Sequence, residues 1–189
     1  MDRREALKSV ALLLGGTVIG AEMFLQAGCK PATKNVSDLF KSDNVAFMNE
    51  IAETILPETS TPGAKAAKVG DFMAVMVRDC YKPEDQEVFI EGLSKVNDES
   101  DKMYKKNFME LDAKQRTAVL TALDVEQRKY AEEKEEGQPN HYFRMMKELT
   151  LLGFFTSEVG ATKALRYLPV PGRYDGCMPY KKGDKAWAT

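Results

Sequence analysis

Apolar residues recur along most of the chain at the three- and four-residue spacing of amphipathic helices, and no alternating strand pattern of useful length occurs. The first helix is expected to begin after the capping residues Ser42 to Asn44. It should end before Pro57, because the residue that precedes a proline is pushed out of the helical region. Residues 58–63 then read as a turn-rich loop. The apolar positions that define this first helix are Val45, Met48, Ala52 and Ile55.

Further helices are predicted downstream. A short apolar helix covers about residues 69–81, and Pro83 suits the first turn of an amphipathic helix that continues to about residue 106. Asp112 and Gln115 have the spacing of a capping box at the start of the next helix. The last pattern has a broad apolar face and should lie at the centre of a bundle. Its core positions are Tyr142, Phe143, Met145, Met146, Leu149, Leu152 and Phe154.

The stretch RYLPVPGRYDGCMPY, residues 166–180, cannot continue this helical pattern. It contains three prolines and two glycines, yet its three tyrosines and two arginines make it too aromatic for a disordered tail. The 189 residues fit one domain with a real hydrophobic core. We therefore predict an all-α fold, a compact helical bundle with an irregular Pro/Gly/Tyr-rich C-terminal extension.

The N-terminus has the layout of an export signal. Arg3 and Arg4 precede an apolar run from Val10 to Ala21, which matches the hydrophobic core of a signal peptide and is short for a membrane-spanning helix. The paired arginines resemble a twin-arginine signal. Ala6 stands where that signal usually has a bulky apolar residue, so a Sec signal with a basic start is the alternative. We divide the chain into a signal peptide (1–29), a polar tether (30–42) and a folded domain (43–189).

The three cysteines are candidates for modification rather than for metal binding. Ala27-Gly28-Cys29 resembles the end of a lipobox, which predicts a lipid on Cys29; the alternative is an incidental cysteine beside an ordinary cleavage site. In an exported protein Cys80 and Cys177 could form a disulfide or remain two partly buried free thiols, and their spacing does not decide between these outcomes. No Cys-x-x-Cys motif or Cys/His cluster is present, so we expect no metal and no cofactor in this chain.

The sequence also lacks the pattern of a catalytic site. Its one histidine, His141, stands at a predicted helix start, where a capping or packing role is expected. No nucleophile elbow, phosphate-binding loop or dinucleotide-binding motif occurs, and the ten methionines fall at helical core spacing. A formal net charge of −2 provides no field that would recruit nucleic acid. We therefore predict that the chain is not an enzyme on its own.

Two stretches carry more specific information. They are Ile51-Ala-Glu-Thr-Ile-Leu-Pro-Glu-Thr-Ser-Thr-Pro-Gly-Ala-Lys-Ala-Ala67, and Phe155-Thr-Ser-Glu-Val-Gly160 leading into Arg166-Tyr-Leu-Pro-Val-Pro-Gly-Arg-Tyr-Asp-Gly-Cys177. In this order, and behind a twin-arginine-like leader, they resemble the gluconate 2-dehydrogenase subunit 3 family from about Val45 to Trp187.

The resemblance implies a small accessory subunit of an exported, FAD-dependent dehydrogenase of sugars or sugar acids. In that family the flavin and the substrate lie in a separate large subunit, and electrons pass onward, often to a multihaem cytochrome c subunit. The small subunit is thought to help the large one mature and to escort it during export. We therefore expect the chain on the periplasmic side, anchored to the membrane through a lipid or through the complex.

If the chain is such a subunit, its two irregular segments are candidate contacts with the flavoprotein, since Tyr and Arg are favoured interface anchors and prolines reduce the entropy lost on binding. The alternative is that both segments cap the chain's own helices. The candidate residues are Arg166, Tyr167, Arg173 and Tyr174 in the C-terminal segment, and Thr59, Thr61, Pro62, Gly63 and Ala64 in the first loop.

Two other classes of function stay open at this point. A free-standing exported lipoprotein that binds a small ligand would need a concave, aromatic-lined pocket, and the sequence offers a single tryptophan, Trp187. An enzyme that acts alone, such as a hydrolase, would have to pair Glu158 with His141.

Overall fold

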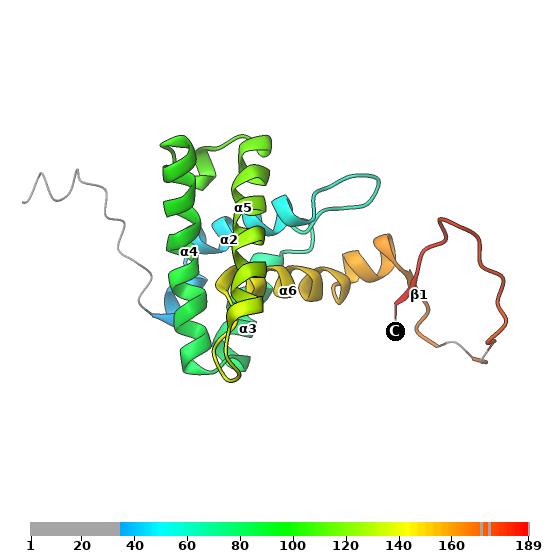
Figure 1. Ribbon diagram of the computed structural model, residues 1–189. Coiled ribbons are helices and arrows are strands. Elements are labelled where there is room, and N and C mark those ends of the chain that lie inside the picture. The colour runs from blue at the N-terminus through cyan, green and yellow to red at the C-terminus, as the bar shows by residue number, and fades with distance from the viewer. Residues whose placement is uncertain (1–34, 171, 174, 189) are drawn as a thin grey trace, which may run out of the picture. The chain divides into compact units, whose positions relative to one another are not determined.

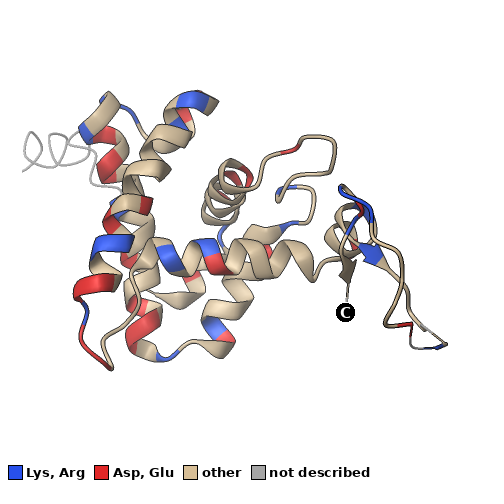
Figure 2. Cartoon of the chain, turned by 45° about the vertical axis from the view of Figure 1, so that its right-hand side comes forward, with Lys and Arg blue, Asp and Glu red and all other residues tan. Residues whose placement is uncertain are grey.

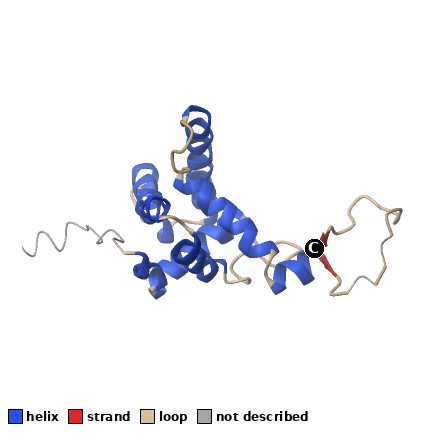
Figure 3. Ribbon diagram, turned by 90° about the horizontal axis from the view of Figure 1, so that it is seen from below, coloured by secondary structure: helices blue, strands red, loops and turns tan. Residues whose placement is uncertain are grey.

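The computed structural model describes residues 35–170, 172–173 and 175–188, and helices dominate this part of the chain (Figures 1 and 3). The α-helices are α2 (Ser42–Ile55), α3 (Val69–Cys80), α4 (Pro83–Tyr104), α5 (Ala113–Glu133) and α6 (Tyr142–Phe155). The shorter elements are the 3-10 helices η1 (Val36–Phe40) and η2 (Phe108–Glu110), the π-helical turn η3 (Gly160–Ala164), and the strands β1 (Arg166–Tyr167) and β2 (Trp187–Ala188). The predicted all-α class is confirmed. None of the helices in the described residues is long and apolar enough to cross a membrane.

Local sequence signals set several of the helix boundaries. α2 ends at Ile55, two residues before Pro57, and Pro83 occupies the first turn of α4, as predicted. The capping box at the start of α5 is also confirmed: Asp112 Oδ1 accepts a hydrogen bond from Gln115 N at 2.9 Å, and Gln115 Oε1 accepts one from Asp112 N at 3.2 Å. The start of α2 differs from the prediction, because the side chain of Asn44 donates to the carbonyl of Asp38 instead of capping the helix.

The centre of the bundle is occupied by α6, which packs against α2, α3, α4 and α5. This placement agrees with the prediction from its broad apolar face. Full burial of a large apolar side chain contributes about 1.5–3 kcal/mol, so the stability of the bundle depends chiefly on the residues that lie deepest. The largest of these fully buried side chains are Phe89, Phe108, Phe143, Phe154, Leu39, Met48, Ile51, Met73, Leu123, Met146, Val69 and Val77. The methionines in this set support the expected core role, whereas Met103, Met109 and Met178 are exposed.

The close crossing of α2 and α3 requires Gly70, in the first turn of α3. A Cβ atom at this position would lie 2.6 Å from the carbonyl oxygen of Val45 and 2.8 Å from the backbone nitrogen of Asn49. The Asn49 side chain exploits the short distance, since its Oδ1 accepts a hydrogen bond from Gly70 N at 2.8 Å. That bond satisfies one of the N-terminal amides of α3 that no carbonyl within the helix can reach.

The predicted tether is too long. Residues 36–40 belong to η1, which is capped by Asn35: the side chain of Asn35 accepts a hydrogen bond from Ser37 N at 3.1 Å. Leu39 is fully buried in the core. Val36 and Leu39 are three positions apart and lie on one face of this helical turn. Because the residues around them are polar, the sequence pattern did not indicate a helix here. The predicted signal peptide, residues 1–29, lies outside the described residues.

His141 is the N-cap residue of α6, in agreement with the role expected from its sequence position. Its Nδ1 accepts a hydrogen bond from Phe143 N at 3.2 Å, so this nitrogen must carry no proton. Nε2 faces Glu126 Oε1 at 3.3 Å, and the ring packs against the side chains of Tyr130 and Tyr142. Burial lowers the pKa of His141 below its ordinary value, and Lys95 adds to this effect, while Glu126 opposes it.

The lowered pKa of His141 predicts a loss of stability in mild acid. The unfolded chain, in which the pKa is near the ordinary 6.5, takes up a proton before the folded chain does. The free energy of unfolding should therefore be fully present above about pH 6.5 and fall below it. His141→Asn keeps an acceptor for the cap but does not titrate. Chemical denaturation between about pH 5 and 8, the range in which histidine titrates, should show a shallower pH dependence in the variant. Parallel profiles of the two proteins would contradict this assignment.

Candidate docking surface

The α2–α3 loop, residues 56–68, is held in shape by the carboxylate of Glu53 in the last turn of α2. Glu53 Oε1 accepts a hydrogen bond from Glu58 N at 2.9 Å, and Oε2 accepts one from Lys65 N at 2.8 Å. The two amides come from the two sides of the loop, so one carboxylate closes it. Ala64 N also donates to the carbonyl of Leu56 at 3.0 Å. Hydrogen bonds to a charged acceptor are stronger than neutral ones, which gives this irregular segment a defined conformation.

Gly63 and Ala64 are part of this closure and do not present a surface to a partner. A Cβ atom on Gly63 would lie 2.2 Å from Glu53 Oε1, so only glycine allows the loop to approach the carboxylate this closely. Gly63 and Ala64 are both buried. Their prediction as contact residues is thus corrected, since they face the chain's own helix. In the same motif Thr59 is exposed and Thr61 and Pro62 are half-buried.

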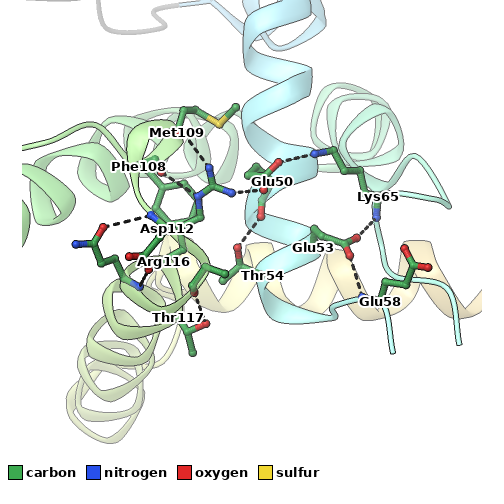
Figure 4. A network of polar contacts seen from close by, with 12 residues as sticks. Glu50, Glu53, Thr54, Glu58, Lys65, Phe108, Met109, Asp112, Arg116 and Thr117 are labelled. Carbon is green, nitrogen blue, oxygen red and sulfur yellow. Dashed lines mark hydrogen bonds and ion pairs between the residues drawn. The ribbon is translucent and has the colours of Figure 1, made fainter. Parts of the chain in front are cut away.

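A second carboxylate, Glu50, connects the loop to the other side of the bundle (Figure 4). Its Oε2 lies 2.6 Å from the Nζ of Lys65, and its Oε1 pairs with the guanidinium of Arg116 on α5. Arg116 in turn donates to the carbonyl oxygens of Phe108, at 3.1 Å, and Met109, at 2.8 Å. The side chains of Glu50 and Arg116 are each only 16% exposed, so this ion pair is screened much less than a surface pair. It joins α2, η2, α5 and the loop in one network.

The C-terminal segment leaves α6 through a tight turn and is then closed by its own ends. Ser157 Oγ donates to the carbonyl of Phe154 at 2.6 Å and accepts from Gly160 N at 3.0 Å. After η3, strand β1 pairs in parallel with β2, with Arg166 opposite Trp187. The Arg166 guanidinium lies over the Trp187 ring, 4.7 Å from its centroid. The intervening residues 168–186 are called the C-terminal loop below; residues 171 and 174 within it are not described.

The described residues of the C-terminal loop do not cap the helical bundle. Every described residue from 167 to 187 is exposed, and Val170 and Tyr180 reach 78% and 77%. Of the predicted contact residues in this segment, Tyr167 and Arg173 are exposed and Arg166 is half-buried against Trp187. Tyr174 lies outside the described residues. The described residues of this segment therefore do not pack on the chain's own helices, which was the alternative arrangement.

An apolar ridge on α6 was missed by the sequence analysis. Leu151, Leu152 and Phe155, here called the α6 ridge, are between 39% and 46% exposed. Leu152 was predicted to lie in the core, because its spacing from Tyr142 and Leu149 fits one buried face. The prediction is wrong because burial depends on the neighbouring helices. The C-terminal half of α6 extends past α4 and α5, so these two helices do not cover it (Figure 1). Helical periodicity alone gives no sign of where the neighbouring helices end.

The other sequence candidates do not come together into a site. His141 precedes α6 and Glu158 follows it, so the 14-residue helix separates them by about 20 Å and they cannot act as a catalytic pair. Cys80 and Cys177 are free thiols, and both are exposed rather than partly buried. Arg3, Arg4 and Cys29 lie outside the described residues. Among the described residues, no group of three His, Cys, Asp or Glu side chains has the arrangement of a metal site.

A shallow groove between α2, α5 and α6 has a volume of about 180 Å³. It is lined in part by Thr54, Thr117 and Phe143 and contains the ion pair between Asp124 and Lys147. Pockets that hold small ligands usually measure about 300–1,000 Å³. This groove is therefore a poor match for the ligand-binding alternative.

The role of Glu53 can be tested by stability measurements. Glu53→Ala leaves two loop amides without their acceptor, which should lower the free energy of unfolding by about 1–2 kcal/mol, because water reaches part of the loop. Glu53→Gln keeps one acceptor and should have an intermediate effect. Glu58→Ala, an exposed position in the same loop, is the matched control and should stay within about 0.5 kcal/mol of the original protein. Urea denaturation measures all three, and equal stabilities for Glu53→Ala and Glu58→Ala would disprove the role of Glu53.

Comparison with known proteins identifies the family. A family model described as gluconate 2-dehydrogenase subunit 3 matches residues 42–172, well over half of the chain. The match begins with α2, includes the α2–α3 loop and the α6 ridge, and ends within the C-terminal loop. No curated protein and no solved structure matches the chain. The resemblance seen in the sequence is thus confirmed, and the chain belongs to the gluconate 2-dehydrogenase subunit 3 family.

Proposed function

We propose that this chain is a non-catalytic accessory subunit of a dehydrogenase that acts on sugars or sugar acids. Its task is to bind the large FAD-containing subunit and to support the export, maturation or anchoring of that subunit. The observation that carries the proposal is the membership of a family of dehydrogenase subunits, in a chain whose C-terminal end presents a shaped and exposed aromatic surface. Catalysis, FAD and any haem are assigned to other subunits of the complex.

The structural roles of the ionisable side chains support a non-catalytic subunit. His141 caps α6, Glu53 closes the α2–α3 loop, and Glu50 is paired with Arg116 and Lys65. Asp124 is likewise paired with Lys147 and Arg128. An acid, base or nucleophile needs a reactive group that faces a substrate cavity, whereas these groups are used by the fold.

The leader sequence supports a role in export. A twin-arginine signal at Arg3 and Arg4 would allow a folded partner to be carried across the membrane with this chain. A lipid on Cys29 would then keep the complex at the periplasmic surface of the membrane. Escort through the twin-arginine pathway requires the two subunits to associate before export, so the partner-binding surface has to be present in the folded chain by then. A bundle with a buried core and a loop closed by its own strands meets that requirement.

Immunoprecipitation of the native protein from solubilised membranes tests this function. We expect an FAD-containing polypeptide, recognised by its flavin absorbance, to be recovered with the chain, together with dehydrogenase activity toward a sugar or sugar acid. The purified chain alone should show no turnover and no flavin. Turnover by the isolated chain, or precipitates without flavin, would refute the proposal.

A further inference from the structure

We propose that the α6 ridge and the C-terminal loop form one docking surface, and that its occupant is the flavoprotein subunit. The surface of the flavoprotein that binds here would be an apolar patch surrounded by carboxylates. This inference rests on the proposed function and adds the location of the contact and the chemistry of the opposing surface. Both parts of the surface lie at the same end of α6, joined by η3 (Figures 1 and 3).

Several large apolar side chains are exposed on this surface. Soluble monomers rarely leave contiguous apolar patches uncovered, and such patches mark interaction sites. Tyr, Trp and Arg, which are enriched at the centres of protein interfaces, are also present here. The large apolar side chains exposed on the ridge, on the two strands and in the loop are Leu151, Leu152, Phe155, Tyr167, Leu168, Val170, Met178, Tyr180 and Trp187.

The positive charge at this end of the chain predicts that negative side chains surround the contact patch on the partner. Between residues 163 and 188 the chain has six lysines and arginines against two aspartates, although its net charge as a whole is −2 (Figure 2). The two aspartates help to shape the loop: Asp175 Oδ1 accepts a hydrogen bond from Cys177 N at 3.3 Å, and Asp184 Oδ2 accepts one from Lys181 N at 2.9 Å. The positive side chains at the exposed edge include Lys181 and Lys182. A surface that complements them carries Asp and Glu.

The surface is organised before it binds. The pairing of β1 with β2 and the contact of Arg166 with Trp187 fix both ends of the C-terminal loop. Pro169 and Pro179 restrict the backbone between them. Because both ends of the loop are fixed, less conformational entropy is lost on association than for a flexible tail. An exposed loop that is closed at its ends therefore suits a stable and specific contact.

The charge around the α6 ridge is a poor match for a lipid bilayer, although the C-terminal loop beside it is basic. Helices that lie on membranes carry Lys and Arg beside their apolar face, which anionic headgroups attract. The α6 ridge is flanked instead by Glu148, one turn before Leu152, and by Glu158, just beyond the helix, and both are exposed. A protein can match positive and negative groups at fixed positions, whereas a bilayer surface of one sign cannot.

Two variants test the apolar and the charged parts separately in the full-length protein. Leu152→Ser/Phe155→Ser removes apolar contacts from the ridge, and Lys181→Glu/Lys182→Glu reverses the charge of the loop. Each pair has a matched control at exposed positions elsewhere: Met103→Ser/Val125→Ser and Lys106→Glu/Lys129→Glu. Circular dichroism and thermal unfolding confirm that all four variants fold, and any variant that does not fold is replaced by the corresponding single substitutions.

The measurement is the affinity of each purified variant for the flavoprotein subunit recovered with the native chain, followed through its flavin. We expect both surface variants to bind at least about tenfold more weakly than the original protein, while both controls bind normally. Added salt should weaken the original complex, and the lysine variant should lose most of this salt dependence.

Several results would overturn the proposal and leave the proposed function intact. Normal affinity in both surface variants would place the contact elsewhere on the chain. Retained flavoprotein binding, together with loss of binding to phosphatidylglycerol vesicles in the surface variants, would make this face a membrane contact. Self-association that only the surface variants lose, with flavoprotein binding unchanged, would make it an interface between copies of this chain. Failure of the original protein to recover any flavoprotein refutes the proposed function itself.

Discussion

The packing of the first half of α6 among the other helices is the constraint on which the rest of the structure depends. Tyr142, Phe143, Met145, Met146 and Leu149 are all buried, and they belong to a helix that contacts α2, α3, α4 and α5. Because this half is fixed so firmly, the second half can extend past α4 and α5 while Phe154 still lies in the core. The same helix thus provides the core at one end and supports the exposed ridge, η3 and the C-terminal loop at the other.

The two segments that carried the family resemblance turn out to have different physical roles. The motif around Pro62 and Gly63 is held by Glu53, so most of its sequence constraint has a structural cause within this chain. The C-terminal segment has such an explanation only at its start, where Ser157 and Gly160 shape the turn after α6. The described side chains of the C-terminal loop are exposed, and its internal hydrogen bonds shape the loop itself. Folding within this chain therefore accounts for the first motif and for the start of the second, but not for the exposed residues of the loop.

Features that depend on a few neighbouring residues could be predicted from the sequence. Pro57, Pro83 and the Asp112 capping box act within one helical turn, and the structure agrees with each. Leu39 and Leu152 could not be placed correctly, because their burial depends on which distant helices lie beside them. The pairing of Glu50 with Arg116 joins residues 66 positions apart, a relation that helical periodicity does not contain. The family was identified from motifs, but the α6 ridge required knowledge of where each helix ends.

The pairing of β1 with β2 also determines the order of events during synthesis. Arg166 and Tyr167 pair with Trp187 and Ala188. The loop therefore stays open while the ribosome translates residues 168–186, the 19 residues between the two strands. The five α-helices all end by residue 155, so none of them needs the last residues of the chain for its own backbone hydrogen bonds. The loop, in contrast, can close only when β2 is present. Recruitment of a partner through that loop would therefore be restricted to chains whose synthesis has reached β2.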